Sequence, residues 1–161
     1  MGLYIYGKHT DKECHWGYSM LHLIRDVALM TCGVNKEFAR ATRAHWEKEG
    51  YTLEHYIKSY CPSFKIAPID LYGLRLAGYY YPNLLFHSDC GGTYTKYGKV
   101  MQDAHLLTGS LKGLKEELEL IKHDLEKDKY EISDCQENAI NQLLELVTDE
   151  LNFKRPIIYF S

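Results

Sequence analysis

Two long runs of apolar residues at helical spacing occupy the last third of the chain and limit what it can fold into. Each run places its apolar side chains on one helix face and its charged side chains on the other. The apolar positions are Leu111, Leu114, Leu118, Ile121 and Leu125 in the first run, and Ile140, Leu144, Val147 and Leu151 in the second. Ser133 and Gln136 form a capping-box pattern before the second run. The spacing predicts two helices packed on a core that contains Leu118 and Leu144.

Short β-prone runs open and close the chain, LYIY at 3–6 and IIYF at 157–160. A helix is predicted from the cap residue Ser19 to Gly33. Further helices are predicted at 36–49, 53–61 and about 70–78. Pairing the two terminal runs would satisfy the backbone groups of both. We therefore expect an α+β fold that is predominantly α-helical, with a small two-stranded sheet pairing the N- and C-terminal strands, in a single globular domain over 1–161.

The charge balance excludes several classes of partner. The chain has 161 residues, with 19 Lys and Arg against 22 Asp and Glu, a formal charge of −3. Such a balance gives no general attraction to nucleic acid or to an anionic membrane. No apolar run is long enough to cross a bilayer, and the start of the chain does not resemble a signal peptide. We expect a cytoplasmic protein that binds neither nucleic acid nor membranes.

The cysteines do not indicate a disulfide framework or a zinc finger. There are five of them, widely spread, and none forms a CxxC pair. The chain also lacks the usual short motifs of phosphate-binding loops, zinc proteases and serine hydrolases. We expect reduced thiols and no cofactor.

A first polar stretch leads into the first predicted helix and contains His15, Ser19, His22 and Arg25. His22 and Arg25 are spaced i, i+3 and share a helix face, and a helix N-terminus offers free N–H groups to an anion. These residues are therefore one half of a candidate polar binding cluster. The alternative is that Ser19 is a helix cap, His22 a surface residue and Arg25 the partner of a carboxylate.

A second polar stretch follows an apolar run and contains His87, Ser88, Asp89 and Cys90 before two glycines. These side chains can bind a ligand, and a cysteine beside a histidine is the minimum of a nucleophile–base pair. A bound metal is not expected; its ligands would come from His15, His22, His87 and Asp89. We expect His87 and Asp89 to lie near the start of the first helix. The alternative is that Ser88 and Asp89 only hold a turn.

Tyrosine is unusually frequent, with 14 residues against five phenylalanines. Tyr79–Tyr81, Tyr94 and Tyr97 flank the second polar stretch. Tyrosine combines apolar area with a polar tip, as is common at recognition surfaces. These rings either form a contact surface or pack half-buried, and periodicity leaves both alternatives open.

The start MGLYIY, the stretch HWGYSMLHLIR at 15–25 and LLFHSDCGG at 84–92 resemble a group of small uncharacterised proteins encoded in bacterial genomes, prophages and phages. Members of this group open similarly, carry H-x-GYS, and have an HSDC-D-G-like stretch in which Gly91 of this chain replaces an Asp. The resemblance implies a bacterial or phage protein of the cytosol and a role in host–phage conflict.

These observations leave three hypotheses about function. The first is a protein that acts by binding, with a protein partner or a small anionic ligand. The second is a small metal- or cysteine-dependent enzyme that uses the HSDCGG loop. The third is a protein in which both polar stretches are purely structural.

Overall fold

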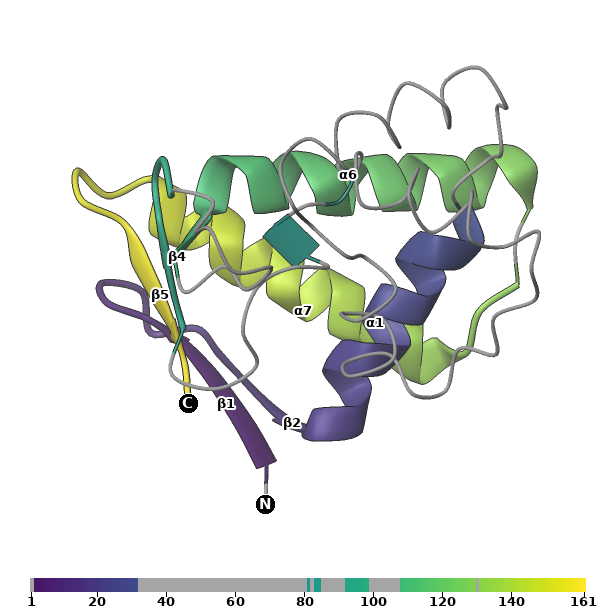
Figure 1. Ribbon diagram of the computed structural model, residues 1–161, viewed down its shortest axis with the longest axis horizontal. Helices are drawn as coiled ribbons and strands as arrows, with labels where there is room; N and C mark the ends of the chain where they lie inside the picture. Colours follow the sequence, from purple (N-terminus) through teal and green to yellow (C-terminus); the bar gives the residue numbers. More distant parts are fainter. Residues whose placement is uncertain (1, 32–80, 82, 85–91, 99–107, 130) are drawn as a thin grey trace, which may run out of the picture.

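The computed structural model describes residues 2–31, 81, 83–84, 92–98, 108–129 and 131–161, in which a five-stranded sheet carries long helices on one face (Figure 1). The strands are β1 (Gly2–Gly7), β2 (Glu13–Gly17), β3 (Thr93–Thr95), β4 (Thr108–Ser110) and β5 (Ile157–Phe160). The long helices are α1 (Tyr18–Thr31), α6 (Leu111–Asp128) and α7 (Asp134–Leu151). The helices expected at 36–49, 53–61 and about 70–78 lie outside the described residues.

The sheet is mixed, with the strand order β2-β1-β5-β3-β4. β1 is antiparallel to both β2 and β5, β5 is antiparallel to β3, and β3 and β4 are parallel. The two ends of the chain meet directly, because Tyr4 N donates to Ser161 O at 2.9 Å and Ser161 N donates to Tyr4 O at 3.0 Å. The strands from the chain ends therefore lie inside the sheet rather than forming a sheet of their own.

The expectation of a predominantly helical fold with a two-stranded sheet is wrong, because the sheet has five strands. The strands that sequence reasoning missed are short, with five residues in β2 and three each in β3 and β4. Segments of this length are too short to produce a clear alternation of apolar and polar residues. Glycines in β2 and β4 weaken the β signal further.

The hydrophobic core lies between the sheet and the helices. Leu3 and Ile5 of β1, Cys14 of β2, and Ile158 and Phe160 of β5 are all buried on the helical side. They pack in one cluster with residues of the helices, chiefly Leu21, Ile24, Leu114, Leu118, Leu143 and Val147. Alternation along the strands thus assigns one face of the sheet to the core.

The helix ends agree only in part with the predictions. The capping box before α7 is confirmed, since Ser133 Oγ accepts from Gln136 N and the Gln136 side chain accepts from Ser133 N. Ser19 is not the cap of α1, because the helix begins at Tyr18, directly after β2.

Leu118 is fully buried as predicted, whereas Leu144 is only partly buried.

Candidate functional site

The side of the sheet opposite these helices carries a row of aromatic side chains. Tyr4 and Tyr6 alternate with the buried residues of β1, Tyr159 alternates with those of β5, and His15 with Cys14 of β2. Because successive strand residues point to opposite faces, the four rings all lie on the outer side. We call Tyr4, Tyr6, Tyr159 and His15 the tyrosine face.

The four rings contact one another in a continuous row. The centroids of Tyr4 and Tyr6 are 4.8 Å apart, and those of Tyr6 and Tyr159 are 5.2 Å apart, both pairs stacked. The His15 ring stands edge-on to Tyr4 at 4.3 Å. Tyr6 and Tyr159 are direct partners in the sheet register. Since the rings hold each other in place, contact with another molecule would cost little side-chain entropy.

The tyrosine face carries little charge. Among the outward-pointing strand residues that the structure describes, Glu13 is the one carboxylate, and none is Lys or Arg. The Tyr4 hydroxyl donates to Glu13 Oε2, and this hydrogen bond is the main cause that raises the pKa of Tyr4. His15 Nε2 lies 3.7 Å from Glu13 Oε1. Glu13 is therefore engaged by its neighbours at the edge of the row.

The polar residues singled out in the sequence fall in different places. His15 lies on the tyrosine face, Ser19 is exposed in the first turn of α1, and Arg25 is fully buried within α1 on the helical side of the sheet. The structure therefore does not bring His15 and Arg25 together. His22 lies in α1. The second stretch, with His87, Ser88, Asp89 and Cys90, lies outside the described residues, and so does its expected contact with the helix start.

Arg25 belongs to a buried polar region that sequence reasoning missed. Its Nε donates to Leu84 O at 2.9 Å, and the Tyr94 hydroxyl donates to Asn83 O at 2.7 Å. Glu117 Oε1 accepts from Asn83 N and Nδ2, and its Oε2 accepts from Leu84 N, each at 2.8 Å. Burial raises the pKa of Glu117 to about 8, against the opposing effect of these hydrogen bonds. The region fixes residues 83–84 between α1 and α6.

The start of α6 is built into the same region. Ser110 N donates to Asn83 Oδ1 at 2.8 Å, and Ser110 Oγ caps the helix by accepting from Gly113 N at 3.1 Å. A Cβ at Gly113 would lie 2.3 Å from Asn83 Nδ2, so a larger residue would have to displace this amide from its hydrogen bond to Glu117. A signal was present in the sequence, since Glu117 falls within the apolar stripe of α6.

A second buried carboxylate joins the two ends of the chain. Glu150 Oε2 accepts from His9 N and Thr10 N, and Oε1 accepts from Ile157 N, each at 3.0 Å. Glu150 is fully buried in α7 and so ties the β1–β2 turn to the start of β5. Both buried carboxylates are thus occupied by backbone donors, which is a structural use of the group.

The described cysteines and possible metal ligands lie in different surroundings: Cys14 is buried, whereas Cys135 is exposed. Within the described residues, no three His, Cys, Asp or Glu side chains lie close enough together to hold a metal ion. Burial raises the pKa of the Cys14 thiol to about 12, so this cysteine is a core residue rather than a nucleophile.

The tyrosines that flank the second polar stretch do not share one role. Tyr81 and Tyr94 are buried in the core, whereas Tyr97 is 69% exposed. Tyr79 and Tyr80 lie outside the described residues. Tyr81 and Tyr94 therefore pack in the core, more deeply than the half-buried packing alternative expected. The grouped tyrosines come from the chain ends, where both β-prone runs alternate tyrosine with buried residues.

Comparisons with known protein families, with curated proteins and with solved structures give no match to this chain. No helix in the described part of the chain has both the length and the apolar composition to span a bilayer.

Proposed function

We propose that this protein acts by binding a protein partner through the tyrosine face. The observation that carries the proposal is the stacked row of Tyr4, Tyr6 and Tyr159 on the side of the sheet away from the described helices. Tyrosine is enriched among the residues that contribute most to protein–protein binding, and charged residues are depleted at interface centres. A rigid, nearly uncharged row of rings fits this composition.

The chemistry of the face favours a protein over a charged ligand. Binding of nucleic acid depends on Lys and Arg contacts to phosphate, and a small anion also needs a cationic or N–H-rich site. The described outward strand residues include no Lys or Arg. The partner in this proposal therefore presents an apolar, uncharged surface that covers the tyrosine rings.

The resemblance to proteins of bacteria, prophages and phages supplies a setting for this proposal. In that setting the protein works in the bacterial cytoplasm, and its partner is a component of the host or of a phage. A role in host–phage conflict is part of the proposal and rests on the resemblance alone.

The proposal is tested by measuring how the face contributes to affinity for a purified partner. A protein captured from bacterial lysate is identified, purified and titrated with the wild-type chain and with Tyr6→Ser and Tyr159→Ser. Because truncation of a central tyrosine typically costs about 2 kcal/mol or more, each variant should bind at least about tenfold more weakly. Thr95→Lys places a charge on the same outer side of the sheet without removing a ring and should weaken binding similarly.

The matched control is Tyr97→Ser, which removes an exposed tyrosine outside the strands and should leave the affinity unchanged. Far-ultraviolet circular dichroism checks that every variant is folded. Equal affinity of the tyrosine-face variants and the wild type would contradict the proposal. A wild-type homodimer that Tyr159→Ser dissociates would contradict it as well, because the face would then be covered by a second copy of the chain.

A further inference from the structure

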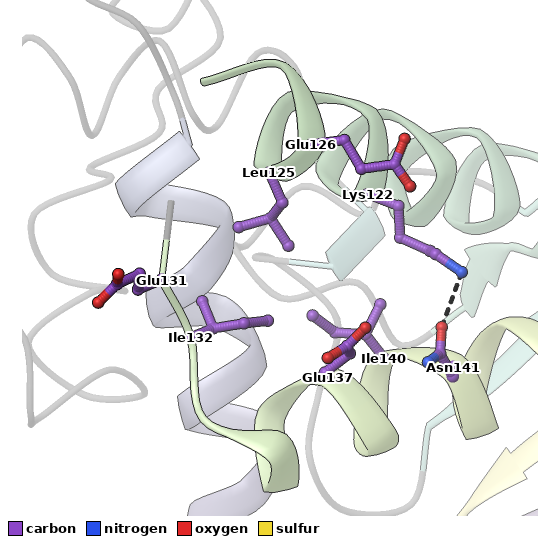
Figure 2. Close-up of a pocket in the computed structure, with 8 residues that line it drawn as sticks. All are labelled: Lys122, Leu125, Glu126, Glu131, Ile132, Glu137, Ile140 and Asn141. Atoms are coloured by element: carbon purple, nitrogen blue, oxygen red, sulfur yellow. Dashed lines mark hydrogen bonds between the residues drawn. The ribbon is translucent and has the colours of Figure 1, made fainter. Parts of the chain in front are cut away.

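A pocket of about 420 Å³ opens between α6, α7 and the segment that joins them (Figure 2). Its lining residues are Lys122, Leu125, Glu126, Glu131, Ile132, Glu137, Ile140 and Asn141. None of them belongs to the tyrosine face. The volume lies within the range of small-molecule sites, roughly 300–1,000 Å³.

The floor of the pocket is apolar. Leu125 comes from α6, Ile140 from α7 and Ile132 from the joining segment, and their side chains point into a common space (Figure 2). Ile140 is buried, whereas Leu125 and Ile132 are only partly buried. An apolar group placed on this floor would remove further hydrocarbon surface from water.

The rim of the pocket is acidic. Glu126, Glu131 and Glu137 are all exposed, and within the described part of the chain no ion pair or hydrogen bond engages their carboxylates. Lys122, the one cation among the described lining residues, is directed to one side, where its Nζ donates to Asn141 Oδ1 at 2.7 Å (Figure 2). Three carboxylates against one ammonium leave the mouth of the pocket negative.

We propose that this pocket binds a small organic amine with an apolar body. The apolar body would lie on Leu125, Ile132 and Ile140, and the ammonium group would donate to carboxylates of the rim. Charge-assisted hydrogen bonds of this kind are stronger than neutral ones. The described lining residues include no aromatic ring, so an aliphatic body matches this part of the floor best.

The proposal is tested by titrating the whole protein with three probes and monitoring each titration by two-dimensional amide NMR. Hexylamine has both the cation and the apolar body, 1-hexanol lacks the cation, and ethylamine lacks most of the apolar body. Hexylamine should bind saturably with a Kd of about 1 mM or below, and each of the others at least about tenfold more weakly. The shifted amides should be those of the pocket lining.

A pair of charge-removing variants separates the pocket from general attraction to an acidic protein. The double variant Glu126→Gln with Glu137→Gln should weaken hexylamine binding at least about tenfold. The matched control Glu116→Gln removes an exposed charge from α6 outside the pocket and should leave the affinity unchanged. Because these glutamates are exposed, the variants should fold, and circular dichroism verifies this.

Three results would overturn the proposal. The first is the absence of saturable hexylamine binding up to about 10 mM. The second is equal binding of hexylamine and 1-hexanol, since the rim would then contribute nothing. The third is an unchanged affinity in the double variant, or an equal loss in Glu116→Gln. None of these results bears on the tyrosine face, so the two proposals fail separately.

Discussion

Glu117 and Glu150 are buried carboxylates that each accept three hydrogen bonds, almost all from backbone N–H groups. Each connects segments that are far apart in sequence, residues 83–84 to α6 in one case and the β1–β2 turn to β5 in the other. Removing either carboxylate would leave buried donors unpaired, which costs roughly 1–3 kcal/mol for each group. At the scale of single residues, the two buried acidic side chains therefore fix backbone segments in place by accepting hydrogen bonds from their N–H groups.

The buried Glu117 should make stability depend on pH. Its folded pKa of about 8 lies above the unfolded value of about 4.3, so the folded state retains a proton that the unfolded state releases. Its contribution is fully present below about pH 4 and is lost as the pH rises to 8, by at most about 1.4 kcal/mol per pH unit. Urea unfolding of the wild type and Glu117→Gln at several pH values measures this contribution.

The quantity to compare is the difference in unfolding free energy between the wild type and Glu117→Gln, since other titrating groups cancel in it. The advantage of the wild type should shrink as the pH rises from 5 to about 8. An advantage that stays constant over this interval would mean that the three donors keep Glu117 ionised in the folded protein, because the group would then be ionised in both states.

At the scale of elements, periodicity predicted α6 and α7 but only part of what α7 buries: Ile140 and Val147 are buried as expected. The buried residues of α7 include Leu143 and Leu146, whereas Leu144 and Leu151 are only partly buried. Leu143 and Leu144 are adjacent, so an apolar stripe can be drawn through either. The choice between them depends on where the sheet and α6 lie, which the spacing within one helix does not contain.

A pair of leucine substitutions checks this packing. Leu118→Ala, at a fully buried position, should lower the unfolding free energy by about 2–5 kcal/mol, because it removes core contacts and leaves a cavity. Leu144→Ala should cost about half as much, since part of that side chain already contacts water. Urea unfolding of the two variants measures both losses of unfolding free energy. Equal losses would mean that Leu144 is as deeply buried as Leu118, which would contradict the orientation of α7 in the structure.

At the scale of the whole molecule, the tyrosine face is assembled from the two ends of the chain. The alternation in LYIY and IIYF was visible in the sequence. It places Tyr6 and Tyr159 on the face of the sheet opposite to that of their buried neighbours in the same strand. That the two rings stack on each other follows from the pairing of β1 with β5 and from its register. Local sequence patterns do not specify register between distant strands, so the face emerged only from the fold.

Local sequence patterns also do not specify the pairing of the other strands or the position of the polar stretch that enters α1. In β2, the residues from Glu13 to Gly17 follow a polar segment and precede a helix, so their pairing with β1 is a tertiary effect. His15 was predicted to join a polar cluster with Arg25, yet pairing in β2 places it beside Tyr4. Interpreting a histidine correctly therefore required knowing which side of the sheet it faces.

Hydroxyl-radical footprinting of the protein alone and in complex with its purified partner tests most directly whether the tyrosine face binds that partner. Oxidation of Tyr6 and Tyr159 should fall when the partner binds, because the rings become covered. Tyr97, which is exposed outside the strands, serves as the internal reference and should be oxidised equally in both states. Unchanged oxidation of Tyr6 and Tyr159 in a complex that protects other residues would show that the partner binds elsewhere and that the tyrosine face is not the binding surface.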